Sequence, residues 1–131
     1  LASRAAPRMA THGGGSIINV ISVGGLKPPA YQGFYSASKA ALQALTKVMA
    51  AEWAPMGIRV NALAPGSFHS DLFDNSAKVL PGFMEGSIAA SLQKRVAETD
   101  EILGSVMYLA SDMSSYTTGS TLVADGGYLV L

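Results

Sequence analysis

The chain has 131 residues, of which 49% are hydrophobic and 14% are charged, as expected for one folded domain or part of a larger one and not for a disordered segment. Nine basic and nine acidic residues cancel, so no net charge favours nucleic acid or an anionic membrane as a partner. The sequence contains no cysteine, which excludes a disulfide framework and thiolate metal sites and fits a reducing compartment. We therefore expect a cytoplasmic protein, and no apolar run is long enough to predict a membrane segment.

The first part of the chain predicts a helix, a strand and a loop. Residues 1–10 have a helix-compatible composition that the glycines of residues 13–15 interrupt. Residues 16–22 (SIINVIS) are rich in β-branched side chains and have glycines on both sides, a pattern typical of a strand buried on both faces. Glycines and prolines over residues 24–33 predict a loop.

The longest predicted helix covers residues 35–54 and ends at Pro55 and Gly57. Apolar side chains recur along it at three- and four-residue steps and form one stripe, made of Ala37, Ala41, Ala44, Leu45, Val48 and Met49. Four larger side chains are interpreted as core or subunit contacts and not as a cofactor site: Met49, Trp53, Met107 and Tyr108.

A second strand and an irregular segment follow. Residues 58–63 (IRVNAL) alternate apolar and polar side chains, which predicts a strand, and Pro65 and Gly66 then predict a turn. Glycines and a proline interrupt helical pieces over residues 67–98, so we expect a mobile excursion there.

The last part of the chain predicts a helix and a strand. Thr99 is the expected N-cap of a helix that runs through residues 102–110, and two acidic residues favour its first turn. Residues 120–124 predict a final strand. The order of strands and helices favours parallel pairing through right-handed crossovers, that is, an α/β fold with part of a Rossmann-type doubly wound parallel sheet. Ligands of such sheets bind beyond the carboxyl ends of the strands, where Ser22, Pro65 and Gly66 fall.

Three polar residues suggest chemistry at that end of the sheet. Tyr35 and Lys39 stand four residues apart and share one helix face, where the lysine ammonium favours the ionised form of the phenol. Ser22 follows the first strand, and its hydroxyl could donate a hydrogen bond to a substrate oxygen held beside the phenol. A Tyr-x-x-x-Lys pair also arises by chance, and serines after strands are often turn residues, so neither feature is specific alone.

Four segments in order resemble the short-chain dehydrogenase/reductase family over nearly the whole chain. GGGSIINVISVGG resembles its fifth strand with the active-site serine, and YSASKAALQALTK resembles its Tyr-x-x-x-Lys helix. GIRVNALAPG resembles its sixth strand and Pro-Gly turn, and EILGSVMYLASDMSSYTTGSTLVADGG resembles its last helix, last strand and Asp-Gly-Gly end. The resemblance implies an NAD(P)-dependent enzyme that interconverts a carbonyl and a secondary alcohol.

The same resemblance implies residue roles. Tyr35 would be the general acid/base and would also contact the bound cofactor. Lys39 would favour the ionised form of Tyr35 and bind the nicotinamide ribose, and Ser22 would orient the substrate oxygen. The residues that would lie against the NAD or NADP nicotinamide are Pro65, Gly66, Ser67, Phe68 and Ser70, the last standing where the family commonly has threonine. His12 and His69 match no family role, and we expect no metal site.

The resemblance covers only the C-terminal half of the family's fold. The glycine-rich pyrophosphate turn and the residue that selects NAD or NADP would lie before Leu1, so residues 1–131 are expected to form a partial NAD(P)-binding domain. Residues 67–98 would be a lid over a small carbonyl or alcohol substrate, and a homotetramer or dimer is the family's usual assembly.

Two questions stay open from the sequence. A 3-oxoacyl thioester reductase and a sugar or polyol dehydrogenase both fit the family pattern. The alternative to an enzyme is a truncated, non-catalytic chain that acts only as a structural or assembly module, because a sheet beginning at residue 16 would expose an apolar edge.

Overall fold

The computed structural model describes residues 2–131 and has a three-layer α/β arrangement. Its sheet contains β1 (Gly15–Val20), β2 (Ile58–Pro65) and β3 (Thr121–Ala124). The α-helices are α1 (Ala2–Ala10), α2 (Gly33–Trp53), α3 (Asp71–Val79), α4 (Phe83–Ala89) and α5 (Leu103–Ala110). Short 3-10 turns lie at Val23–Gly25, Ala54–Met56, Thr99–Ile102, Asp112–Ser114 and Tyr128–Val130.

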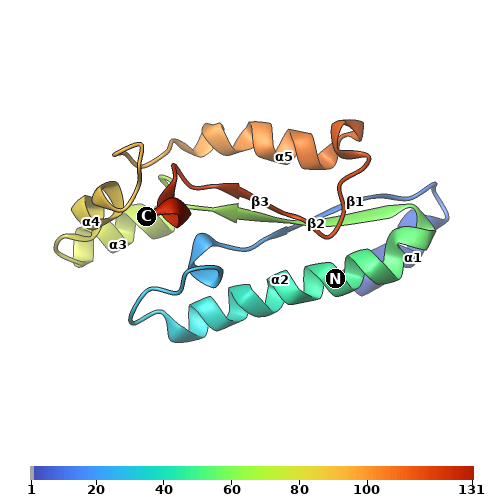
Figure 1. The fold of residues 1–131 in the computed structure, drawn as a ribbon, viewed down its shortest axis with the longest axis horizontal. Coiled ribbons are helices and arrows are strands. Elements are labelled where there is room, and N and C mark those ends of the chain that lie inside the picture. Colours follow the sequence, from blue (N-terminus) through green and yellow to red (C-terminus); the bar gives the residue numbers. More distant parts are fainter. Residues whose placement is uncertain (1) are drawn as a thin grey trace.

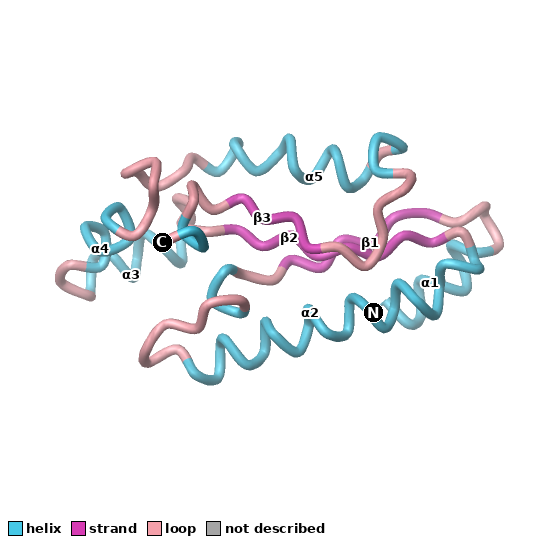
Figure 2. The backbone as a smooth tube through the Cα atoms, viewed as in Figure 1, coloured by secondary structure: helices cyan, strands magenta, loops and turns pink. Residues whose placement is uncertain are grey.

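The three strands are parallel and lie in the order β1-β2-β3, which confirms the predicted fold class. Figure 1 shows α1 and α2 on one face of the sheet and α5 on the other. The tube in Figure 2 shows the loops after β1 and β2, and the chain end after β3, gathered at the same end of the molecule as α3 and α4. The carboxyl ends of all three strands therefore meet where the sequence predicts a ligand site.

The central strand β2 forms most of the core. Val60, Ala62 and Ala64 are fully buried because helices cover both faces of this strand. Its polar Asn61 is also fully buried, and its amide donates to the Thr117 carbonyl (2.8 Å) and accepts from the Ser120 N–H (3.0 Å). Because both ends of the amide are paired, burial of this polar side chain is compatible with a stable core.

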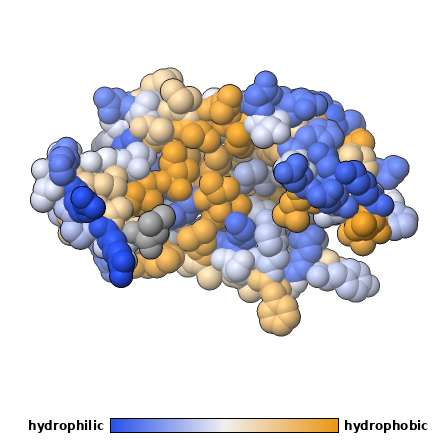
Figure 3. Space-filling view, turned by 180° about the vertical axis from the view of Figure 1, so that it is seen from behind, coloured by the Kyte–Doolittle hydropathy of each residue, from blue (hydrophilic) through white to orange (hydrophobic). Residues whose placement is uncertain are grey.

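The prediction that residues 16–22 are buried on both faces is wrong for most of β1. Side chains of this strand are half-buried or exposed, and Val20 is 54% exposed. The reason is topological: β1 pairs with β2 alone, and among the described residues no strand covers its other edge. Figure 3 views the molecule from behind, from the side of α1 and β1, and shows a broad hydrophobic area across this face.

The helix α2 begins at Gly33, two residues before its predicted start, and buries a face that differs from the apolar stripe. Met49 is buried, but the other five residues of that stripe are exposed. The buried positions include Thr46, whose hydroxyl donates to the Leu42 carbonyl (2.8 Å) and accepts from the Asn19 amide (2.9 Å). The face of α2 that packs on the sheet thus includes a polar pair with β1, which the pattern of apolar side chains did not predict.

Thr99 is not the N-cap that its sequence position predicts. Glu98 occupies the cap, and the Glu101 carboxylate accepts from the Glu98 N–H at 2.7 Å, as the fourth residue of a capping box does. The Thr99 hydroxyl instead donates to the carbonyl of His69, 2.7 Å away. The α5 layer therefore begins with a carboxylate cap, while Thr99 connects this layer to the residues that follow β2.

Across the part of the chain that the structure describes, no helix is both long and apolar enough to span a bilayer.

Candidate active site

Ser22 lies two residues beyond β1 and opens the turn that follows it. Its extended backbone places the side chain over this turn, where Oγ accepts a hydrogen bond from the N–H of Gly24 at 3.1 Å. Because the serine oxygen accepts from the backbone, its own proton is left for another acceptor. The local fold thus prepares Ser22 as a hydrogen-bond donor.

Gly24 marks the point where Ser22 and Tyr35 meet. A Cβ built on this buried glycine would lie 3.5 Å from Ser22 Oγ and 3.5 Å from Cε1 of the Tyr35 ring. The turn after β1 and the first turn of α2 thereby place Ser22 and Tyr35, which are 13 positions apart in sequence, on either side of this point. The structure therefore brings together the serine and the tyrosine predicted from sequence.

Lys39 lies one helical turn after Tyr35. Its Nζ is 5.7 Å from the centroid of the Tyr35 ring and donates to the Val20 carbonyl at 3.1 Å. Gly25 packs so closely on α2 that an added Cβ would come within 2.8 Å of Lys39 Cβ. The turn after β1 is thus seated on the helix that carries the tyrosine and the lysine.

The predicted nicotinamide segment, Pro65 to Ser70, leaves the sheet next to this turn. Gly66 N–H donates to the Ala124 carbonyl at 2.8 Å, and its Cα approaches Asp125 so closely that an added Cβ would lie 2.7 Å from the Asp125 Cα. Ser70 caps α3, with its Oγ accepting from the Phe73 N–H at 3.2 Å. The segment is therefore fixed at both ends.

The backbone N–H and carbonyl of Phe68 are available for hydrogen bonds to a ligand. The bonds of its bridge to Ala97 run from Ala97 N–H to the Ser67 carbonyl (3.0 Å) and from His69 N–H to the Ala97 carbonyl (2.9 Å). Among the described residues, the N–H and carbonyl of Phe68 itself form no hydrogen bond. An adjacent backbone donor and acceptor suit a carboxamide, which carries one of each.

The bridge between Phe68 and Ala97 also closes the segment that contains α3 and α4. Beyond it, Phe73 and Phe83 join the two helices with ring centroids 5.0 Å apart, and no residue of either helix is buried. His69 pairs with Asp74 at 2.8 Å across the start of α3. The helical pieces expected in this segment are therefore two short helices, and the bridge closes the segment at its base, or neck.

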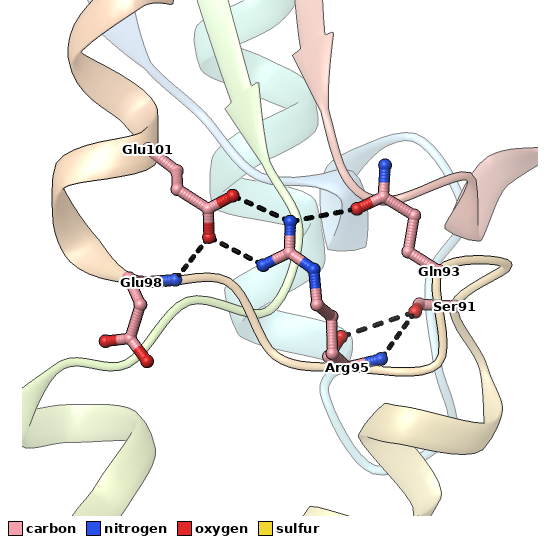
Figure 4. Close-up of polar contacts among 5 residues, drawn as sticks. All are labelled: Ser91, Gln93, Arg95, Glu98 and Glu101. Carbon is pink, nitrogen blue, oxygen red and sulfur yellow. Dashed lines mark hydrogen bonds and ion pairs between the residues drawn. The ribbon is translucent and has the colours of Figure 1, made fainter.

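Arg95 fixes the end of this segment to the start of the α5 layer (Figure 4). Its guanidinium makes two hydrogen bonds of 2.6 Å to the Glu101 carboxylate and one of 3.1 Å to Gln93. Glu101 also accepts from the Glu98 N–H at 2.7 Å. Hydrogen bonds from Arg95 and from this backbone N–H lower the pKa of Glu101 from its usual 4.5 to about 2.

Acid should therefore weaken the fold through Glu101. Between pH 4.5 and about 2 the unfolded chain binds a proton at this carboxyl that the folded chain does not, so stability present above this window is lost as the pH falls through it. We expect Glu101→Gln to flatten the dependence of the urea midpoint on pH in this range, since glutamine does not titrate. Glu52→Gln, an exposed change of the same charge on α2, is the control. Equal slopes in native protein and Glu101→Gln would contradict the prediction.

A cavity of about 190 Å³ adjoins the same neck. Ser67 and Phe68 line it together with Arg95 and Asp125, whereas none of Ser22, Tyr35 and Lys39 does. The predicted nicotinamide segment therefore borders this cavity, and the three predicted catalytic side chains do not.

The sequence analysis did not single out Gln32. Its Oε1 lies 3.8 Å from the same Cβ position on Gly24 that Ser22 and Tyr35 approach. The residue stands three positions before the tyrosine in a loop whose course a pattern of glycines and prolines does not predict. Its side-chain direction becomes visible only in the folded chain.

Comparisons with known proteins identify relatives of this chain. A family model described as "Enoyl-(Acyl carrier protein) reductase" matches residues 1–129. The A-factor type gamma-butyrolactone 1'-reductase of Streptomyces virginiae is 42% identical over 126 residues, which cover 96% of this chain and 49% of the relative. The galactitol 2-dehydrogenase of Cereibacter sphaeroides is 40% identical over 132 residues, which cover 98% of this chain and 52% of the relative.

Solved structures show the same fold. The gluconate 5-dehydrogenase of Burkholderia cenocepacia, in complex with NADP and tartrate, has a TM-score of 0.90 at 35% identity and matches 96% of this chain and 49% of its own. A short-chain type dehydrogenase/reductase of Mycobacterium marinum has a TM-score of 0.89 at 39% identity and matches 97% and 50% of the two chains. The chain spans about half the length of the curated relatives that it matches. From the family model and these likenesses, the chain belongs to the short-chain dehydrogenase/reductase family.

Proposed function

We propose that the full-length protein is an NAD(P)-dependent oxidoreductase that interconverts a carbonyl and a secondary alcohol by hydride transfer. The observation that carries the proposal is the approach of Ser22 Oγ and the Tyr35 ring to one point at Gly24, with the Lys39 ammonium one helical turn away. A bound nicotinamide supplies or accepts the hydride. The residues of this chain hold the reacting oxygen and move its proton.

The proton is handled by Tyr35. During reduction its hydroxyl gives a proton to the substrate oxygen, and during oxidation the phenolate takes that proton back. The Lys39 ammonium lies 5.7 Å from the centroid of the Tyr35 ring, beside the group that exchanges the proton. Ser22 accepts from Gly24 N–H and so donates its own proton to the substrate oxygen, which stabilises the charge that develops there.

The nicotinamide would lie against Pro65, Gly66, Ser67, Phe68 and Ser70. The unpaired backbone N–H and carbonyl of Phe68 support this placement, because a carboxamide can bond to both. Lys39 is the residue proposed for the nicotinamide ribose. In this arrangement its ammonium would extend a second hydrogen bond beyond the Val20 carbonyl that it already contacts.

The half of the relatives' length that this chain does not span is proposed to supply the dinucleotide-binding turn. The uncovered edge of β1 supports this division, since a further parallel strand can pair there. We further propose that α3 and α4 act as a lid. Their closed neck, together with the absence of buried residues in either helix, allows them to move without opening the sheet.

Replacement of Ser22 tests the proposal. We expect Ser22→Ala in the full-length protein to lower kcat by ~10²-fold, because one preorganised donor to the charged oxygen is lost. The measurement is cofactor absorbance during reduction of a panel of carbonyl compounds. Ser115→Ala, an exposed change in the loop before β3, should keep native turnover. Native kcat in Ser22→Ala would contradict the assigned role.

A further inference from the structure

Gln32 occupies the N-cap position of α2, yet its side chain does not cap the helix. The carboxamide forms no hydrogen bond with another described residue, and its Oε1 lies 3.8 Å from the Cβ position on Gly24 that Ser22 Oγ and the Tyr35 ring approach to 3.5 Å. The residue is exposed, so its carboxamide is accessible to a ligand. A third polar group therefore borders the space where the reacting oxygen is proposed to sit.

The chemistry of a carboxamide limits what it can recognise there. It offers one acceptor oxygen and two N–H donors without a net charge. A substrate hydroxyl can both donate to and accept from such a group. Because Ser22 and Tyr35 are already assigned to the reacting oxygen, Gln32 is placed to bond a second oxygen on the neighbouring carbon.

The charges in the same loop favour a neutral second group over a carboxylate. The sequence from Val23 to Gln32 contains one cation, Lys27. Its ammonium donates to the Leu131 carbonyl at 2.6 Å and lies 5.1 Å from the centroid of the Tyr128 ring. It is therefore engaged with the C-terminal segment and does not offer an ion pair to an acidic substrate at Gly24.

We propose that Gln32 selects substrates with a hydroxyl on the carbon next to the reacting carbonyl, that is, α-hydroxy ketones and the vicinal diols formed from them. The inference rests on the proposed function, because it assumes that Ser22 and Tyr35 hold the reacting oxygen. It narrows the two substrate classes left open by the sequence toward the polyol type. Gly24 places no side chain at the point that Ser22 Oγ, the Tyr35 ring and Gln32 Oε1 approach.

Acetoin and 2-butanone form a matched pair of probes, since they differ only by the hydroxyl next to the carbonyl. The full-length native protein should reduce acetoin with a higher kcat/KM. Gln32→Met, which keeps the length of the side chain and removes its polar atoms, should lower kcat/KM for acetoin by ~10-fold and leave 2-butanone unchanged, as expected for one lost hydrogen bond. Gln43→Met makes the same chemical change in the middle of α2, where the side chain reaches Thr121 at 3.3 Å, and should keep the native ratio.

The outcomes separate this inference from the proposed function. An unchanged substrate ratio in Gln32→Met, or an equal loss for both ketones, would contradict the role of Gln32. Turnover of 3-oxoacyl thioesters without any preference for acetoin over 2-butanone would contradict the substrate class alone. If the native protein reduces no carbonyl compound with either cofactor, the proposed function itself is wrong.

Discussion

Tyr35→Phe should lower kcat of the full-length protein by ~10³-fold, because it removes the only atom proposed to exchange a proton with the substrate oxygen. The phenylalanine ring can still pack beside Gly24, and Lys39 can still donate to the Val20 carbonyl. The fold and the affinity for the cofactor should therefore be preserved while turnover is lost. Initial rates from cofactor absorbance, together with titration of the cofactor by fluorescence, measure the two effects separately.

Tyr116→Phe is the matched control for this experiment. Tyr116 is fully exposed and precedes β3, so loss of its hydroxyl should leave turnover at the native level. If Tyr35→Phe turns over within about threefold of the native rate, the proposed role of Tyr35 in proton transfer is wrong. If Tyr35→Phe instead loses affinity for the cofactor and keeps kcat, Tyr35 binds the cofactor without transferring the proton.

Gly14→Ala should destabilise the fold by about 4 kcal/mol through two added costs. Gly14 has a φ of +97°, where an alanine is strained, and its Cβ would lie only 2.1 Å from the Gly57 carbonyl oxygen. The contact cannot relax easily, because Gly15 N–H donates to the same oxygen at 3.1 Å and β1 begins there in register with β2. Urea unfolding followed by circular dichroism measures the loss.

Gly13→Ala separates the clash from the strain. Gly13 has a similar φ of +89°, but nothing lies within 4 Å of its added Cβ. This variant should lose only about 1–2 kcal/mol, the cost of the left-handed conformation for a residue other than glycine. Equal losses in the two variants would show that the turn between α1 and β1 moves away from Gly57 without cost.

Sequence patterns predicted the order and direction of the strands because each depends on local composition and on general rules of connection. The strand over residues 58–63 and the helix over residues 35–54 were predicted within two residues at each end. Ser22 and Tyr35 could be named as candidates from sequence, since one follows a strand and the other begins a helix at the same end of the sheet, but the resemblance of four segments to one family was needed to choose them. The meeting of their side chains at Gly24 depends on the close packing of Gly25 on α2.

The expectations that failed depend on contacts between distant residues. Thr99 looks like a cap, but its hydroxyl bonds to His69, thirty residues earlier, while Glu98 and Glu101 cap the turn. Thr46 is buried because Asn19 on another element supplies its partner. Gln32 could not be assigned from its neighbours, since its side chain leaves the helix end that it would ordinarily cap. To predict each of these contacts, one must know where a group from a distant part of the sequence lies in the folded chain.

The bridge at Phe68 and Ala97 lets the segment beyond it change without altering the sheet. Its two backbone bonds, at 3.0 and 2.9 Å, hold the entrance and exit of that segment side by side. An insertion or deletion of helical residues between positions 71 and 89 would therefore change only the segment beyond the bridge. The sheet would keep its stability, because lengthening a loop adds little to the entropic cost of closing it. The segment between the two sides of the bridge can therefore vary in evolution while the sheet and the reacting residues stay the same. Proteins with the same reacting residues can then differ in the substrates that they bind.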